Sequence, residues 1–143
     1  MLRIGIIGGS GYVGSELLRL LLFHPQVEVT MITSRQSVGE YVFNVHPNLR
    51  SITQLKFVPQ DMAELKKNCD LIFTATPHGG SVNLVPKLLE TGLKVIDMSA
   101  DYRLKTPPTM KLIMAGNMRI QKCLKMQHTA YPRFIGKKSR QPR

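Results

Sequence analysis

The sequence predicts an α/β fold built on a doubly wound parallel sheet. Short runs rich in apolar and β-branched residues alternate with segments of helical periodicity, which is the pattern of parallel strands joined by crossover helices. A glycine-rich segment, residues Gly8–Gly14, directly follows the first of these strands. The 143 residues are enough for about one domain, so we expect a single, incomplete sheet domain followed by an irregular tail.

The boundary between domain and tail is predicted from charge. All nine acidic residues lie at or before Asp101, where nine Lys and Arg residues balance them. Residues 102–143 hold the other eleven basic residues and no acidic ones, which accounts for the net charge of +11. Pro107 and Pro108 interrupt the chain at the same place. We therefore predict a domain over residues 1–105 and a basic, poorly structured tail over residues 106–143.

The first half of the domain reads as strand, helix, strand. Leu2–Ile7 and Val27–Thr33 are apolar enough to be buried parallel strands. Between them, Gly11–Phe23 has the periodicity of an amphipathic helix. One face of that helix would carry the side chains of Val13, Leu17, Leu20 and Leu21.

The second half repeats the alternation. We predict strands at Ile52–Val58, Leu71–Ala75 and Lys94–Met98, with helices at Asp61–Lys67 and Gly80–Thr91. In an open parallel sheet, ligands bind beyond the carboxyl ends of the strands. The residues after each strand are therefore the candidates for function.

The segment after the first strand reads Gly8-Gly9-Ser10-Gly11-Tyr12-Val13-Gly14. Glycines at 8, 11 and 14 permit a tight turn and close backbone approach to a pyrophosphate, and the following helix offers free N–H groups. The spacing is not GxGxxG, and a glycine-rich turn without a ligand is the alternative. Strand before and helix after favour a Rossmann-type dinucleotide site.

The end of the second predicted strand distinguishes between cofactors. NAD-binding folds usually place an acidic residue there for the ribose hydroxyls, whereas this chain has Thr33-Ser34-Arg35. A hydroxyl and a guanidinium suit a ribose 2′-phosphate, because Arg pairs with phosphate in charge-assisted, often bidentate contacts. We therefore predict NADP, with a solvated loop charge as the alternative for Arg35.

Several segments together resemble N-acetyl-gamma-glutamyl-phosphate reductase. The glycine segment continues as Ser15-Glu16-Leu17-Leu18-Arg19 and is followed by His24-Pro25. The later matching segments are Thr33-Ser34-Arg35, His46-Pro47-Asn48-Leu49-Arg50, Thr76-Pro77-His78-Gly79 and Val95 to Leu104. This family reduces an acyl phosphate to an aldehyde with NADPH in arginine biosynthesis, and close relatives act on carrier-bound substrates in lysine biosynthesis. Aspartate-semialdehyde dehydrogenase resembles the chain less well.

The resemblance implies roles for individual residues. Ser10, Gly11, Tyr12 and Val13 would contact the pyrophosphate, and Ser34 with Arg35 would hold the 2′-phosphate. Pro77, His78 and Gly79 would lie along the cofactor toward the nicotinamide, although His78 could instead bond only to backbone groups.

A second set of residues follows the last predicted strand. Ser99, Asp101 and Arg103 would face the active site, with Arg103 as a partner for an anionic substrate. The alternative is that Asp101 and Arg103 pair with each other.

The catalytic residues are not expected in this chain. The family's reaction needs a thiolate, which attacks the acyl phosphate, and a nearby acid/base, usually His. Cys69 precedes a strand and should be a small, buried thiol, and Cys123 has no matching surroundings. Neither cysteine has metal or disulfide spacing, and we predict no metal site. By resemblance, the nucleophile and the catalytic His lie beyond the point where the chain leaves the family pattern.

The tail suggests a change of reading frame. We consider the codons in a shifted frame, in which each new codon starts at the third base of one codon and continues into the next. In that frame the codons of Met110-Lys111 can encode only Glu, and those of Met114-Ala115 can encode only Gly. The other pairs of neighbouring codons permit a continuation that resembles the reductase. We infer a frameshift near residues 105 to 109. The chain would then be an inactive fragment of a cytosolic enzyme that is a homo-oligomer when intact and acts on a small acyl phosphate.

A different class of function stays open for the tail. Eleven basic residues without acids would bind phosphates, so the chain could be a Rossmann-type module with a nucleic-acid-binding arm. The basic residues are scattered among Met, Ile and Leu without aromatic stacking residues in a recognisable motif, which disfavours this alternative. No stretch is long and apolar enough for a membrane helix, so we expect no membrane partner.

Overall fold

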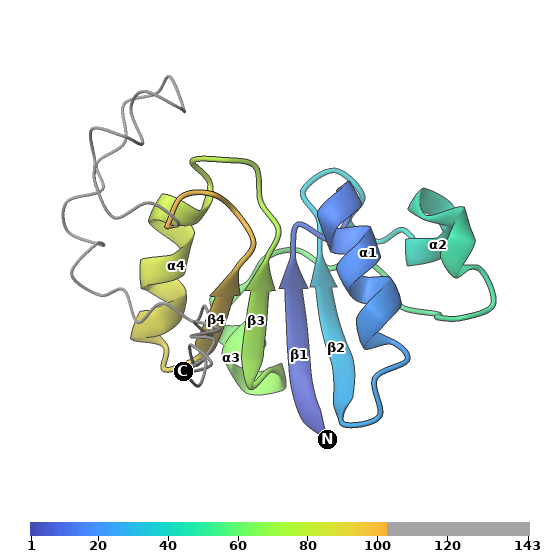
Figure 1. Ribbon diagram of the computed structural model, residues 1–143, viewed down its shortest axis with the longest axis horizontal. Coiled ribbons are helices and arrows are strands. Elements are labelled where there is room, and N and C mark those ends of the chain that lie inside the picture. Colours follow the sequence, from blue (N-terminus) through green and yellow to red (C-terminus); the bar gives the residue numbers. More distant parts are fainter. Residues whose placement is uncertain (103–143) are drawn as a thin grey trace, which may run out of the picture.

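The computed structural model describes residues 1–102 and shows four parallel strands in one sheet (Figure 1). The strands are β1 (Leu2–Ile7), β2 (Val27–Thr33), β3 (Leu71–Thr74) and β4 (Lys94–Asp97), and their order across the sheet is β2-β1-β3-β4. The central strand β1 pairs in parallel with both β2 and β3. The predicted doubly wound parallel sheet is therefore confirmed.

Helices cover both faces of this sheet. They are α1 (Tyr12–Leu21), α3 (Met62–Asn68) and α4 (Ser81–Glu90), and Figure 1 shows α1 in front of β2 and α3 behind the sheet. Each face has its own core. The core on the α1 side includes Ile4, Ile6 and Leu18, and the core on the other side includes Ile7 from β1, Leu65 from α3 and Leu88 from α4. Alternate residues of β1 thus pack on opposite faces, as the pleat of a strand requires.

The predicted strand Ile52–Val58 is wrong. Only isolated bridges form there, Val58 to Thr33 and Lys56 to Tyr41, and Ile52 is exposed. The segment is apolar because Phe57, 1 % exposed, packs into the core on the α1 side, not because its backbone joins the sheet. A short apolar run cannot by itself distinguish these two situations.

Two short helices that the sequence analysis did not predict precede this segment. They are α2 (Val42–Val45) and the 3-10 helix η1 (Pro47–Leu49), and His46 lies between them. Val42 and Leu49 are completely buried in the core on the α1 side. Residues 36–58 therefore form an irregular layer beside β2, fixed to the sheet by a few deeply buried side chains.

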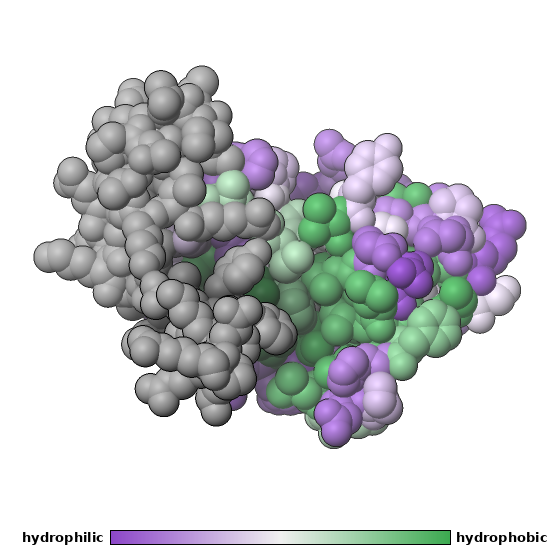
Figure 2. All heavy atoms as spheres, in the orientation of Figure 1, coloured by the Kyte–Doolittle hydropathy of each residue, from purple (hydrophilic) through white to green (hydrophobic). Residues whose placement is uncertain are grey.

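The carboxyl ends of all four strands lie at the same edge of the sheet, at the top of Figure 1. Figure 2 shows apolar residues across the middle of the visible face and mainly hydrophilic residues at the described loops of this edge. No described helix is long and apolar enough to cross a membrane. The predicted tail, residues 106–143, and Arg103 lie outside the described residues, so the domain boundary at Lys105 stays a prediction.

Candidate functional site

The glycine segment folds into a loop pressed tightly against the sheet. Gly8 has a φ of +85°, which side chains disfavour, and a Cβ atom there would lie 2.5 Å from the carbonyl oxygen of Ala75. A Cβ atom on Gly14 would lie 2.6 Å from the carbonyl oxygen of Gly8. The glycines at positions 8 and 14 are therefore required by the fold, because they bring the strand end and the start of α1 into contact.

Backbone hydrogen bonds fix the orientation of this loop. The N–H groups of Gly8 and Gly9 both donate to the carbonyl oxygen of Thr33 at the end of β2, over 3.2 and 2.9 Å. The carbonyl oxygen of Gly9 accepts a hydrogen bond of 2.8 Å from Nε2 of His46. The loop is thus tied both to the neighbouring strand and to the irregular layer.

The amino end of α1 is open to a ligand. Its N-cap residue is Gly11, no side chain caps it, and its first turn has no acidic residue. By contrast, the carboxylate of Asp61 caps α3, and that of Asp101 accepts from the N–H of Ser81, the first residue of α4. The side chain of Tyr12 is 98 % exposed and that of Val13 is 51 % exposed. The free N–H groups and the positive dipole end of α1 therefore face open space, an arrangement that fits a pyrophosphate.

Ser34 and Arg35 lie next to this loop and differ in their contacts. The Ser34 hydroxyl donates to Oγ of Ser10 over 3.0 Å and accepts from the N–H groups of Gln36 and Ser37 over 3.2 and 3.1 Å. Ser34 is buried, and its hydroxyl builds the turn that follows β2. Arg35 is exposed and forms no hydrogen bond or ion pair within the described residues. Its guanidinium group is therefore available to an anion.

Asp101 caps the N-terminus of α4 from 20 residues further along the chain. Its carboxylate oxygens lie 2.8 and 2.9 Å from the N–H of Gly79, and one of them also accepts from the N–H of Ser81 over 3.1 Å. Asp101 is 0 % exposed. Its carboxylate is directed at the helix, so these hydrogen bonds do not support a direct contact between Asp101 and the substrate. The alternative, a pair between Asp101 and Arg103, involves a residue outside the described range.

Asp97 is the centre of a second, partly buried network that the sequence analysis missed. Its Oδ1 accepts from the hydroxyls of Thr74 and Ser81 over 2.6 and 2.7 Å, and its Oδ2 accepts from the hydroxyl of Ser99 over 2.6 Å. Ser99 is 4 % exposed, and its Oγ also accepts from the N–H of Asp101. Ser81 links the two carboxylates, because its hydroxyl donates to Asp97 and its N–H donates to Asp101. Only the position of Asp97 at a strand end could have suggested this role.

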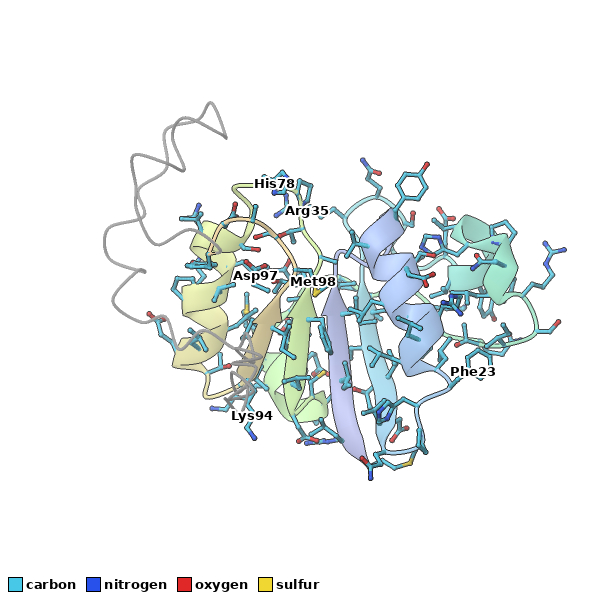
Figure 3. All side chains as sticks on the ribbon, in the orientation of Figure 1. Phe23, Arg35, His78, Lys94, Asp97 and Met98 are labelled. Carbon is cyan, nitrogen blue, oxygen red and sulfur yellow. The ribbon has the colours of Figure 1, made fainter. Side chains whose placement is uncertain are left out.

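The loop between β3 and α4 carries Pro77, His78 and Gly79, all of which are exposed. Nδ1 of His78 accepts a long hydrogen bond of 3.4 Å from the N–H of Ala100. This contact matches the expectation that the imidazole bonds to backbone, and it leaves a cofactor contact untested. Figure 3 shows that both His78 and Arg35 lie at the carboxyl edge of the sheet.

Cys69 lies at the opposite end of the sheet, as expected. It precedes β3, is 2 % exposed, and its Sγ is 3.5 Å from the hydroxyl of Thr30. Burial raises the pKa of the Cys69 thiol. Because a nucleophilic cysteine needs an accessible thiolate, Cys69 has the properties of a structural residue.

Comparison with known proteins identifies the family of this fold and site. The model of the family described as semialdehyde dehydrogenase, NAD binding domain, matches residues 3–129. This match extends past Lys105, where composition predicts the end of the domain. A structure of aspartate semialdehyde dehydrogenase with NADP from Candida albicans superimposes with a TM-score of 0.64 at 21 % identity, covering 72 % of this chain and 31 % of that one.

Two curated relatives are much closer in sequence. An N-acetyl-gamma-glutamyl-phosphate reductase from Methanocella arvoryzae is 58 % identical over 106 residues, covering 74 % of this chain and 32 % of the relative. A [LysW]-L-2-aminoadipate/[LysW]-L-glutamate phosphate reductase from Saccharolobus solfataricus is 48 % identical over 110 residues, covering 77 % and 31 %. The chain thus spans about a third of the length of these relatives. It belongs to the semialdehyde dehydrogenase family and carries residues of that family's NAD-binding domain.

Proposed function

We propose that this chain is the NADP-binding part of a reductase that converts N-acetyl-gamma-glutamyl phosphate to its semialdehyde. The observation that carries the proposal is the open N-terminus of α1, because its uncapped N–H groups lie directly beside the glycine loop while α3 and α4 are capped by carboxylates. When bound there, the nicotinamide cofactor supplies the hydride for reduction of the acyl group.

NADP is the proposed cofactor because of the groups that follow β2. Arg35 is exposed and without a partner in residues 1–102, and no acidic residue is present at this point to hold a ribose hydroxyl or to repel a phosphate. Ser34 would contribute mainly through the turn that its hydroxyl stabilises, on which Arg35 is placed. Pro77, His78 and Gly79 would then border the nicotinamide half of the cofactor.

The substrate is proposed from the relatives. Reductases of free N-acetylglutamyl phosphate and of LysW-linked substrates both match this chain, and we favour the free substrate of arginine biosynthesis because the Methanocella arvoryzae reductase is 58 % identical. Arg103, which follows the buried Asp101 cap, would contact the anionic substrate. We further propose that the thiolate and acid/base are not supplied by residues 1–102, that the chain alone is inactive, and that the intact enzyme is a homo-oligomer.

A binding experiment tests the cofactor proposal. Isothermal titration of the full chain should show NADP⁺ binding more tightly than NAD⁺. Arg35→Ala should weaken NADP⁺ binding by about tenfold or more, because a charge-assisted phosphate contact is lost, and should leave NAD⁺ binding unchanged.

Arg50→Ala provides a matched control. Arg50 is also an exposed arginine, at the end of η1, and its replacement should leave both cofactor affinities unchanged. An equal loss of NAD⁺ and NADP⁺ affinity in Arg35→Ala would contradict the 2′-phosphate role. No binding of either cofactor to the unaltered chain would contradict the proposed function itself.

A further inference from the structure

His46 makes a buried contact that the proposed cofactor site does not by itself explain. Its side chain is 9 % exposed and lies beside Phe57 of the core on the α1 side, and its Nε2 is 2.8 Å from the carbonyl oxygen of Gly9. A carbonyl oxygen can only accept, so Nε2 must carry the proton and donate it. The bond joins residues 37 positions apart in sequence, from the irregular layer to the glycine loop.

The His46 ring is held rigidly in this position. The His46 N–H donates to the carbonyl oxygen of Val42 over 2.8 Å, and its own carbonyl oxygen accepts from the N–H of Leu49 over 2.9 Å. Pro47 follows and excludes the helical conformation at His46, whose ψ is 82°. The imidazole also meets the buried ring of Phe57 edge-on, with the ring centroids 6.2 Å apart. These contacts fix the direction from which the donor reaches the loop.

The peptide that accepts this hydrogen bond is one that could otherwise rotate. It lies between Gly9 and Ser10, directly after Gly8, whose φ of +85° shows that the loop uses conformations open mainly to glycine. In a trans peptide the C=O and N–H groups point in opposite directions. Fixing the Gly9 carbonyl toward His46 therefore fixes the Ser10 N–H away from it. The described hydrogen bonds give the Ser10 N–H no partner.

We propose that His46 is a positioning residue that sets the Gly9–Ser10 peptide in the orientation needed to bind the cofactor pyrophosphate. The proposal rests on the proposed NADP function of the loop. Without the imidazole, the peptide samples both orientations, and binding must restrict it at a cost in affinity. On this account His46 contributes to the cofactor site from the irregular layer although it touches no cofactor atom.

Two variants distinguish the contribution of the hydrogen bond to NADP⁺ affinity from the contribution of the ring's shape. His46→Phe keeps a flat ring without a donor, and it should raise the Kd for NADP⁺ about tenfold. His46→Gln can place an amide N–H near the position of Nε2, and it should keep the Kd within about threefold of the unaltered chain. Adenosine 2′-monophosphate, which lacks a pyrophosphate, should bind the unaltered chain and both variants equally in an NMR titration. His24→Phe is the matched control, because His24 is exposed beyond the end of α1.

The outcomes distinguish this inference from the proposed function. If the unaltered chain binds NADP⁺ and His46→Phe binds it equally well, the positioning role is wrong and the cofactor site stands. If both variants weaken adenosine 2′-monophosphate as much as NADP⁺, His46 supports only the general fold. If the unaltered chain does not bind NADP⁺, the proposed function is wrong and the positioning role falls with it.

A measurement on the unaltered chain decides the matter if His46→Phe does not fold. The ¹⁵N spectrum of His46 should show a proton on Nε2 that exchanges slowly with water, and NADP⁺ should shift the Ser10 amide resonance. A proton on Nδ1 alone, or a Ser10 amide that does not respond to NADP⁺, would overturn the proposal.

Discussion

Replacement of Asp101 by alanine removes the buried carboxylate that caps α4. The change leaves the N–H groups of Gly79 and Ser81 without their acceptor, and the 0 % exposure of Asp101 limits access of water to the vacated position. Gly79 is exposed, so water can reach its N–H, but Ser81 is buried, and a buried donor left unsatisfied costs about 1–3 kcal/mol. Loss of an N-cap by itself typically costs about 1 kcal/mol. We therefore expect Asp101→Ala to lower the free energy of unfolding by about 2–4 kcal/mol.

Asp61→Ala is the matched comparison for this prediction. Asp61 also caps a helix by accepting from two backbone N–H groups, those of Ala63 and Glu64, but it is exposed. Water can replace its carboxylate, so the cost should be about 1 kcal/mol. Asp101→Asn keeps one acceptor oxygen and should fall between the two alanine variants.

Urea denaturation followed by circular dichroism measures these differences. Hydrogen exchange adds a local readout, because the Gly79 and Ser81 amides should lose protection in Asp101→Ala while amides of β1 change only with global stability. If Asp101→Ala is no more destabilising than Asp61→Ala, the carboxylate is not the buried cap that we describe.

Further predictions concern the loop, the sheet and the thiol. Gly14→Ala should abolish NADP⁺ binding and reduce thermal stability, because its Cβ atom would meet the Gly8 carbonyl oxygen at 2.6 Å; a variant that binds normally would contradict the tight packing of the loop. Arg3 lowers the pKa of Asp70 from 3.8 to about 2, so this pair stabilises the fold above pH 4 and the contribution is lost as the pH falls toward 2. Acid unfolding curves of Arg3→Ala should lack that part of the pH dependence, and curves parallel to those of the unaltered chain would refute the assignment. Alkylation and peptide mass mapping should label Cys69 only after unfolding, and rapid labelling of the native chain would contradict its burial.

Much of the fold was predictable because it depends on local patterns. The bounds of β1 and β2 were predicted to the residue, since each is a compact apolar run, and α1 and α4 were placed within two residues at each end. The layer formed by residues 36–58 was not predictable in this way. Phe57 and His46 are buried by contacts with distant residues, and the hydrophobic periodicity of a segment does not predict such contacts.

The same distinction applies to the site. The glycine loop and Arg35 could be identified from their positions after strands, because the sheet topology alone brings strand ends together. The partners of Asp101 and His46 could not, since each side chain bonds to backbone groups 20 or more positions away. Proximity to a strand end placed Asp101 and Ser99 near the site, but only the geometry shows that they bond to Gly79, Ser81 and Asp97.

A titration of the ¹⁵N-labelled full chain with NADP⁺, followed by NMR, tests the central claim most directly. The account predicts that amide resonances shift in the glycine loop and at Ser34 and Arg35. The amides of His78 and Gly79 should also shift, and they report on the segment Pro77–Gly79 because proline has no N–H. It also predicts saturation at lower concentration than with NAD⁺. Resonances that stay unchanged in these segments, or shifts confined to residues 103–143, would contradict it, and the latter result would favour a basic arm that binds phosphates without a cofactor site.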